Sequence, residues 1–129
     1  MILFIDTSNF DNLTLALVNG PVVKQQVMSL AFNENYKTNA FVQKFLKLQK
    51  TEPKDLTKII ACSGPGSFTG IRVGVSLAQA LGFALHIPVL AIPKTKVPDD
   101  LRKLSSVKGG QHLVVNYGQK PNITKAKSK

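Results

Sequence analysis

The sequence predicts one α/β domain with elements in the order βββαβαβ, a mixed five-stranded sheet with two main helices. The opening of the chain holds three strand-like segments separated by turn residues. Two later segments have a helical period, and each is followed by a short apolar run typical of a buried strand. With 129 residues, of which 43% are apolar, the chain is long enough for a single hydrophobic core but not for two.

The first three strands are expected within the opening thirty residues. Met1 to Asp6 is an apolar run that ends in polar residues, and Leu13 to Leu17 alternates with a period of two. Asn19-Gly20 is a dipeptide typical of hairpin turns. We therefore expect residues 22–31 to return as an antiparallel third strand.

The segment 36–50 is expected to be the first helix. Its apolar face comprises Phe41, Val42, Phe45, Leu46 and Leu48. Lysines and a glutamine occupy the opposite face, which makes the helix amphipathic. Thr51-Glu52-Pro53 ends it, and Lys58 to Cys62 follows as the fourth strand.

The segment Gly70 to His86 is expected to be the second helix, and it is apolar nearly all round. Its polar positions lie on one narrow line: Arg72, Ser76, Gln79 and His86. Such a helix is buried on more than one side, and its own sheet covers only one. Gly74 and Gly82 would allow another helix to approach closely. This pattern predicts an obligate partner; Pro88 to Pro93 then forms the fifth strand.

The loop Gly64 to Gly70 joins the fourth strand to the second helix, where backbone N–H groups and the helix dipole can bind an anion. It matches none of the known templates. Ile71 replaces the lysine of a Walker A loop, and Thr69 replaces a glycine of the dinucleotide fingerprint. Pro65 replaces a glycine of the nucleophile elbow. The loop is either a tight strand-to-helix connection or an anion site.

The sequence indicates no metal site, no internal disulfide and no membrane segment. His86 and His112 lack metal-ligand spacing, so we expect no metal site. The single cysteine, Cys62, excludes an internal disulfide and fits a reducing compartment. No apolar run approaches the length needed to cross a bilayer, and the start lacks the basic region of a signal peptide. We therefore expect a cytoplasmic protein without membrane contact.

The net charge of +10 is concentrated towards the end of the chain. Residues 94–129 hold nine basic residues against two acidic ones, a net charge of +7, and residues 125–129 form a lysine-rich tail. The tail either contacts a polyanion such as RNA or is a solvated surface segment.

Several segments taken together resemble the TsaB (YeaZ) family: the start ILFIDTS, the loop GPGSFTGIRVG with the helix after it, and the strand PVLAI. Residues 117–124 are similar to the family's carboxy-terminal ending. The resemblance implies an actin/sugar-kinase/Hsp70-like (ribonuclease H-like) amino-terminal lobe in residues 1–93. Residues 94–129 would then be a reduced second-lobe remnant with a basic tail, a shortened form largely lacking the second lobe.

The resemblance also implies a role as a non-catalytic scaffold subunit. Such subunits pair with a TsaD-like enzyme through two helices from each partner and, with a TsaE-like ATPase, support threonylcarbamoylation of the tRNA adenosine next to the anticodon. Contact with tRNA would be indirect, and the isolated chain would either form a homodimer through its helices or be poorly soluble. The implied interface residues are Phe41, Phe45, Leu48, Arg72, Val73, Gly74, Leu77 and Gln79. Arg72 either meets an acidic group or carbonyl of the partner or is a snorkelling surface residue.

The alternative is an actin-like ATPase fragment that binds nucleotide or phosphate with the glycine loop. Its candidate residues are Asp6, Gly64, Gly66, Ser67, Thr69 and Gly70. Asp6 stands where actin-like kinases keep an acidic residue, but Ser8 replaces the glycine that follows in them, and the clamping second lobe is missing. Asp6 is then a turn-capping carboxylate. We therefore expect no catalytic residue and no intrinsic cofactor, with ATP only at the partner interface.

Overall fold

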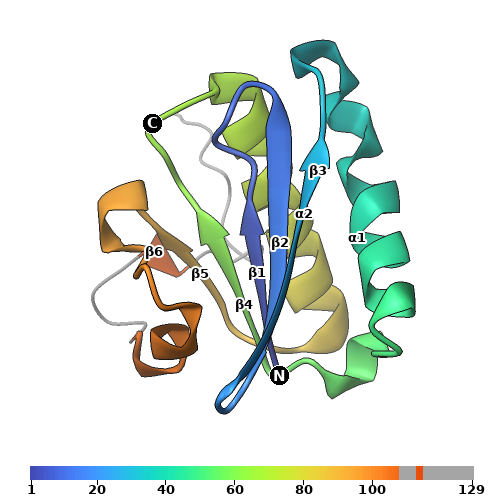
Figure 1. Ribbon diagram of the computed structural model, residues 1–129, viewed down its shortest axis with the longest axis vertical. Coiled ribbons are helices and arrows are strands. Elements are labelled where there is room, and N and C mark those ends of the chain that lie inside the picture. Colours follow the sequence, from blue (N-terminus) through green and yellow to red (C-terminus); the bar gives the residue numbers. More distant parts are fainter. Residues whose placement is uncertain (108–112, 115–129) are drawn as a thin grey trace.

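A six-stranded sheet with the order β3-β2-β1-β4-β5-β6 forms the centre of the computed structural model, which describes residues 1–107 and 113–114 (Figure 1). The strands are β1 (Ile2–Asp6), β2 (Asn12–Asn19), β3 (Val22–Ser29), β4 (Lys58–Cys62), β5 (Val89–Ile92) and β6 (Leu113–Val114). The helices are α1 (Thr38–Leu48) and α2 (Phe68–Leu85). Short 3-10 segments are η1 (Phe32–Lys37), η2 (Pro53–Asp55), η3 (Lys94–Lys96) and η4 (Leu101–Ser106).

The sheet is mixed, as the sequence predicts. β1, β2 and β3 form an antiparallel meander, while β4 is parallel to both β1 and β5. Asn19 pairs with Val22, so the hairpin loop consists of Gly20 and Pro21. Gly20 has a φ of 61°, as the first central residue of a type II′ turn requires. The five predicted strands are confirmed, but β6 adds a sixth, antiparallel to β5.

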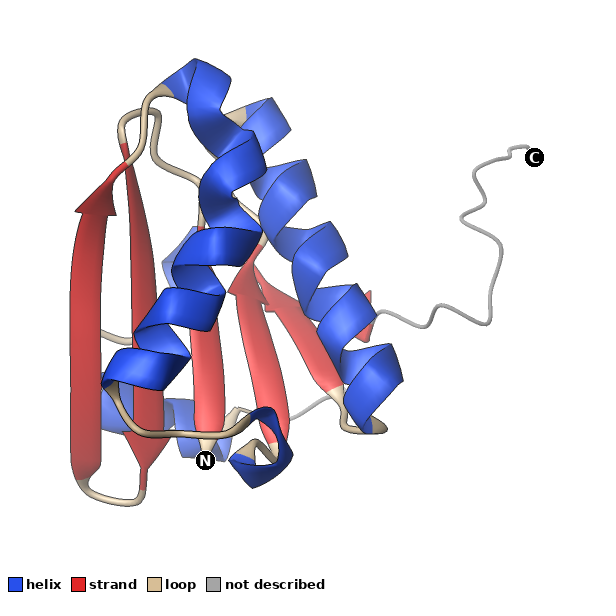
Figure 2. Ribbon diagram, turned by 90° about the vertical axis from the view of Figure 1, so that its right-hand side faces the viewer, coloured by secondary structure: helices blue, strands red, loops and turns tan. Residues whose placement is uncertain are grey.

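The two faces of the sheet are covered in different ways. Because strand side chains alternate, Leu3 and Ile59 lie on one face, and Phe4 and Ile60 on the other. The first face is covered by α1 and α2, which lie side by side (Figure 2). The second is covered by η4, whose Leu104 is fully buried. Residues 94–107 thus contribute to the same hydrophobic core as the strands.

The two helices begin where local hydrogen bonds dictate, not where the period alone suggests. α1 starts two residues later than predicted because Phe32–Lys37 forms η1. α2 starts two residues earlier because Ser67 is its N-cap: the hydroxyl oxygen accepts a hydrogen bond of 3.1 Å from the Gly70 N–H. α2 ends at His86, whose φ of 59° is left-handed and stops the helix.

One expectation about membranes needs correction. α2 has 18 residues and a mean hydropathy of 1.4, so by length and composition alone it could cross a bilayer. A helix of a globular core passes the same test, and α2 packs against β4, β1 and β5. The predictions for His112, for the family-like ending at 117–124 and for the lysine tail lie outside the described residues.

A candidate partner-binding face on helix α2

The side of α2 that contacts the sheet consists of very small residues. Gly70, Gly74, Ala78 and Gly82, each four positions from the next, are its buried residues. A Cβ added at Gly74 would overlap Thr7 Oγ1, and one at Gly82 would overlap a methyl group of Val89. The prediction that Gly74 and Gly82 face a partner helix is therefore wrong. These glycines let α2 approach the chain's own sheet.

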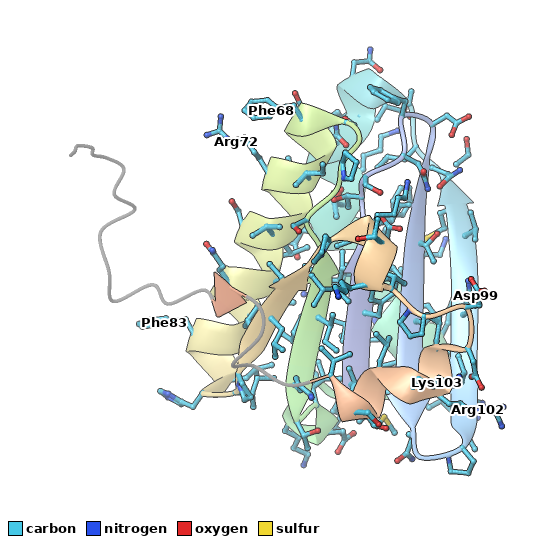
Figure 3. The ribbon with its side chains drawn as sticks, turned by 90° about the vertical axis from the view of Figure 1, so that its left-hand side faces the viewer. Phe68, Arg72, Phe83, Asp99, Arg102 and Lys103 are labelled. Atoms are coloured by element: carbon cyan, nitrogen blue, oxygen red, sulfur yellow. The ribbon has the colours of Figure 1, made fainter. Side chains whose placement is uncertain are left out.

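The opposite side of α2 carries large apolar residues in solvent. Phe68 is 72% exposed and Phe83 68% exposed, and Figure 3 shows both pointing away from the sheet together with Arg72. We call this surface the α2 outer face; its members are Phe68, Thr69, Arg72, Val73, Ser76, Ala80, Phe83 and Ala84. The fully buried positions of α2 thus hold only small residues, while two of its largest residues, Phe68 and Phe83, are exposed.

A shallow depression of about 480 Å³ lies at the amino-terminal end of this face. It is lined by Phe68, Thr69, Arg72, Val73 and Ser76. The Arg72 guanidinium carbon lies 5.4 Å from the centroid of the Phe68 ring, within the range of a cation–π contact. One aromatic ring and one cation therefore stand together at the rim of an open, largely apolar hollow.

The structure divides the predicted interface residues into three groups. Arg72 and Val73 lie on the α2 outer face, and Leu48 is 58% exposed on α1. Phe41, Leu77 and Gln79 are half-buried, the first two against the core between helices and sheet. Phe45 is only 1% exposed and Gly74 is buried, so both belong to the chain's own core, contrary to the prediction that they contact a partner.

Sequence reasoning missed Phe68 and Phe83. Phe68 was assigned to the glycine loop because the helix was expected to begin at Gly70. The signal that could have found it is Ser67, a favourable N-cap residue directly before Phe68. The outward direction of Phe83 also has a local signal, because Phe83 lies seven residues after Ser76 and four after Gln79, on the line of polar positions of α2.

The glycine loop packs tightly against the turn that follows β1. The Ser67 N–H donates a 2.7 Å hydrogen bond to the Ser8 carbonyl, and the Thr7 hydroxyl donates one to the Gly70 carbonyl. A Cβ at Gly66 would overlap the backbone of Ser8, and one at Gly70 would overlap the carbonyl oxygen of Thr7. Close approach to β1 is thus sufficient to explain both glycines.

Three candidates for nucleotide binding remain: Asp6, Gly64 and Thr69. Asp6 Oδ1 accepts hydrogen bonds from the Ser8 N–H at 2.9 Å and the Ser8 hydroxyl at 2.6 Å, which is the predicted turn-capping contact. Gly64, with a φ of 96°, is buried, and its carbonyl accepts a 2.7 Å hydrogen bond from the Lys94 N–H. Thr69 instead lies on the α2 outer face.

Cys62 lies close to this turn and offers little reactivity. Its thiol is buried, with Sγ 3.9 Å from Ser8 Oγ. Burial raises the pKa of the Cys62 thiol, so the nucleophilic thiolate is disfavoured. Among residues 1–107 and 113–114, no group of three or more His, Cys, Asp and Glu side chains could hold a metal ion.

Residues 31–97, which include both helices and the glycine loop, match a family model described as "TsaD: tRNA N6-adenosine threonylcarbamoyltransferase". The chain belongs to this family. The tRNA threonylcarbamoyladenosine biosynthesis protein TsaB of Bacillus subtilis is 37% identical over 91 residues, which are 70% of this chain and 40% of that protein. The TsaB of Buchnera aphidicola from Schizaphis graminum is 34% identical over 92 residues, 71% of this chain and 43% of that protein.

The comparison with solved structures gives the same family. YeaZ from Pseudomonas aeruginosa superposes with a TM-score of 0.64 at 27% identity, over 71% of this chain and 44% of that one. The predicted resemblance to TsaB (YeaZ) and the predicted actin-like, ribonuclease H-like fold are confirmed. The chain spans less than half the length of these relatives, 40% and 43% for the two TsaB proteins.

Proposed function

We propose that the chain is an accessory subunit in tRNA threonylcarbamoyladenosine biosynthesis. It binds a TsaD-like enzyme through the layer formed by α1 and α2 and activates that enzyme, without transferring the threonylcarbamoyl group itself. The names of the relatives support the pathway. In this proposal the TsaE-like ATPase and tRNA are further members of the complex, tRNA contact is indirect, and ATP binds only where the subunits meet.

The observation that carries the proposal is the exposure of Phe68 on α2. Its side chain is 72% exposed, although the fully buried positions of the same helix hold only glycine and alanine. Fully burying a phenylalanine side chain is worth about 1.5–3 kcal/mol, and exposed aromatic residues flanked by small ones are the usual anchors of protein interfaces. A partner seated on the α2 outer face would recover this free energy.

The glycine loop supports a binding role more than a catalytic one. The Ser67 hydroxyl oxygen accepts the Gly70 N–H as a helix cap, and the Ser67 N–H is bonded to Ser8. The Asp6 carboxylate accepts two hydrogen bonds from Ser8. These groups stabilise the corner between β1 and α2, and their hydrogen bonds within the chain compete with any phosphate.

The test is to mix the chain with the TsaD-like subunit encoded in the same genome and to measure the dissociation constant by sedimentation. Phe68→Asp should weaken the heterodimer by about 100-fold or more, as expected when a central aromatic anchor is lost. Phe10→Asp is the control, since Phe10 is 66% exposed in the β1–β2 turn and belongs to neither helix. It should leave the dissociation constant within about twofold.

Substitutions at Phe45 or Gly74 do not test the interface, because both positions belong to the core. Circular dichroism should show that Phe68→Asp and Phe10→Asp remain folded. Absence of any wild-type complex would refute the proposed function. A complex that tolerates Phe68→Asp would refute the assignment of the α2 outer face as the interface.

A further inference from the structure

The charged side chains of α1 and α2 are all positive. α1 contains Lys44 and Lys47, α2 contains Arg72, and neither helix contains an aspartate or glutamate. The ion pairs formed within residues 1–107 and 113–114 are Lys37–Glu34, Lys54–Glu52 and Arg102–Asp100, so Arg72 takes part in none of them. A cation without a counter-charge thus stands on the α2 outer face.

Arg72 is held in place by its aromatic neighbour. Its guanidinium lies over the Phe68 ring, with 5.4 Å between the guanidinium carbon and the ring centroid, and both residues line the same depression. This contact restricts a long side chain and so lowers the entropy that binding would otherwise cost. The planar guanidinium presents N–H groups in a fork that matches a carboxylate.

We infer that the protein seated on the α2 outer face presents a carboxylate to Arg72 and an apolar side chain to the depression beside it. The inference rests on the proposed function and specifies the chemistry of the partner's contact surface. A partner that covered Phe68 would also remove water from Arg72, and a desolvated charge without a counter-ion is costly. The partner must therefore supply the negative charge.

The same reasoning distinguishes between occupants of the face. In a symmetric homodimer the same patch meets itself, so a second copy would bring Lys44, Lys47 and Arg72 from its two helices, and the carboxylate of the adjoining η1, Glu34, is already paired with Lys37. An RNA would offer phosphates, but the hollow has one cation beside Phe68 and Val73 rather than the cluster of cations that binds a phosphate backbone. An apolar protein surface containing an acidic residue matches both properties of the site.

The inference is tested with the full chain and the TsaD-like subunit of the same genome, by measuring the dissociation constant at low and high salt. Arg72→Gln should weaken binding at least about 30-fold, the equivalent of about 2 kcal/mol, and Arg72→Glu should weaken it more. Arg72→Lys should fall between wild type and Arg72→Gln, because the charge remains and the fork is lost. Arg72→Gln should also reduce the salt dependence of binding.

Lys44→Gln is the matched control, since it removes an exposed cation of the same layer from α1. It should change the dissociation constant less than about threefold. If Arg72→Gln stays within twofold of a wild-type chain that binds, the charge pairing is refuted and the proposed function stands. If the wild-type chain does not bind, both are refuted.

Two further measurements address the other occupants. If the isolated chain dimerises and Arg72→Gln tightens that dimer, the α2 outer face serves a second copy and the inference is overturned. If Arg72→Gln weakens the affinity of the isolated chain for tRNA but not for the TsaD-like subunit, the counter-ion is a phosphate and the inference is likewise overturned. Unchanged dimerisation and unchanged tRNA affinity in Arg72→Gln are the expected results.

Discussion

The helices α1 and α2 lie side by side on the same face of the sheet, yet they use their side chains in opposite ways (Figure 2). α1 buries Val42, Phe45 and Leu46 against the sheet and places its lysines in solvent. α2 fully buries only glycine and alanine, packs Leu77 and Leu81 partly against the core, and leaves Phe68 exposed. α1 therefore buries a phenylalanine within the chain, whereas α2 leaves one on its surface.

The difference shows that apolar character alone does not place a residue in the hydrophobic core of its chain. Thr7, in the turn after β1, and Val89 of β5 lie so close to the helix axis that no side chain fits between them and Gly74 or Gly82. Larger residues must then lie on the other sides of the helix. On α1, in contrast, one of the two phenylalanines, Phe45, enters the core.

The largest expected effect comes from comparing one phenylalanine of each helix. Phe45→Ala should lower the free energy of unfolding by about 3–5 kcal/mol, because it leaves a cavity in the core. Phe68→Ala should change it by less than about 0.5 kcal/mol, because that ring is exposed. Urea denaturation of both variants measures the difference. Equal losses would contradict the contrast between the two helices.

The next effect concerns the small side of α2. Gly74→Ala should cost about 1–3 kcal/mol in unfolding free energy, although alanine is the better helix former, because its Cβ overlaps Thr7 Oγ1. Ala80→Ser on the exposed side of the same helix is the control and should be neutral within about 0.5 kcal/mol. A stabilising Gly74→Ala would mean that α2 does not pack as closely as described.

A smaller effect is expected at the amino-terminal caps. Ser67→Ala should destabilise the chain by about 0.5–2 kcal/mol, because it removes the oxygen that accepts the Gly70 N–H. α1 has no side-chain cap at the corresponding position, Lys37. Thermal denaturation of Ser67→Ala beside Thr69→Ala, which lies exposed in the first turn, separates capping from a general change in helix propensity. Equal melting temperatures for these two variants would contradict the capping role.

The smallest expected effect is the heat of ATP binding at the start of α2. Titrating ATP into the isolated chain should give no saturable heat, because the glycines there accommodate β1 and the Ser67 N–H is already bonded to Ser8. Saturable binding with a dissociation constant below about 1 mM would favour the alternative, a nucleotide-binding fragment. Gly66→Val is unsuitable as a control, since it would overlap Ser8 and disturb the fold.

Much of the fold follows from local sequence signals. Lys58–Cys62 is predicted with the bounds that the structure has, because an apolar run between polar residues marks a buried strand. Gly20 marks the hairpin because few residues other than glycine adopt its φ. The start of α2 was misplaced by two residues because helical period was weighed above the capping residue Ser67. Leu104 could not be recognised as a core residue, since it lies in a polar segment and is buried by strands distant in sequence.

The candidate site was predicted only in part. Arg72 and Val73 were expected at the interface and lie on the exposed side of α2, but Gly74 and Phe45 were expected there and are buried. The sequence by itself determined that α2 is apolar nearly all round, and therefore needs more than one covering surface. Only the tertiary structure decided which side its own sheet covers. That choice depends on steric fit with Thr7 in the turn after β1 and with Val89 on β5, whose distances from α2 no local pattern of residues records.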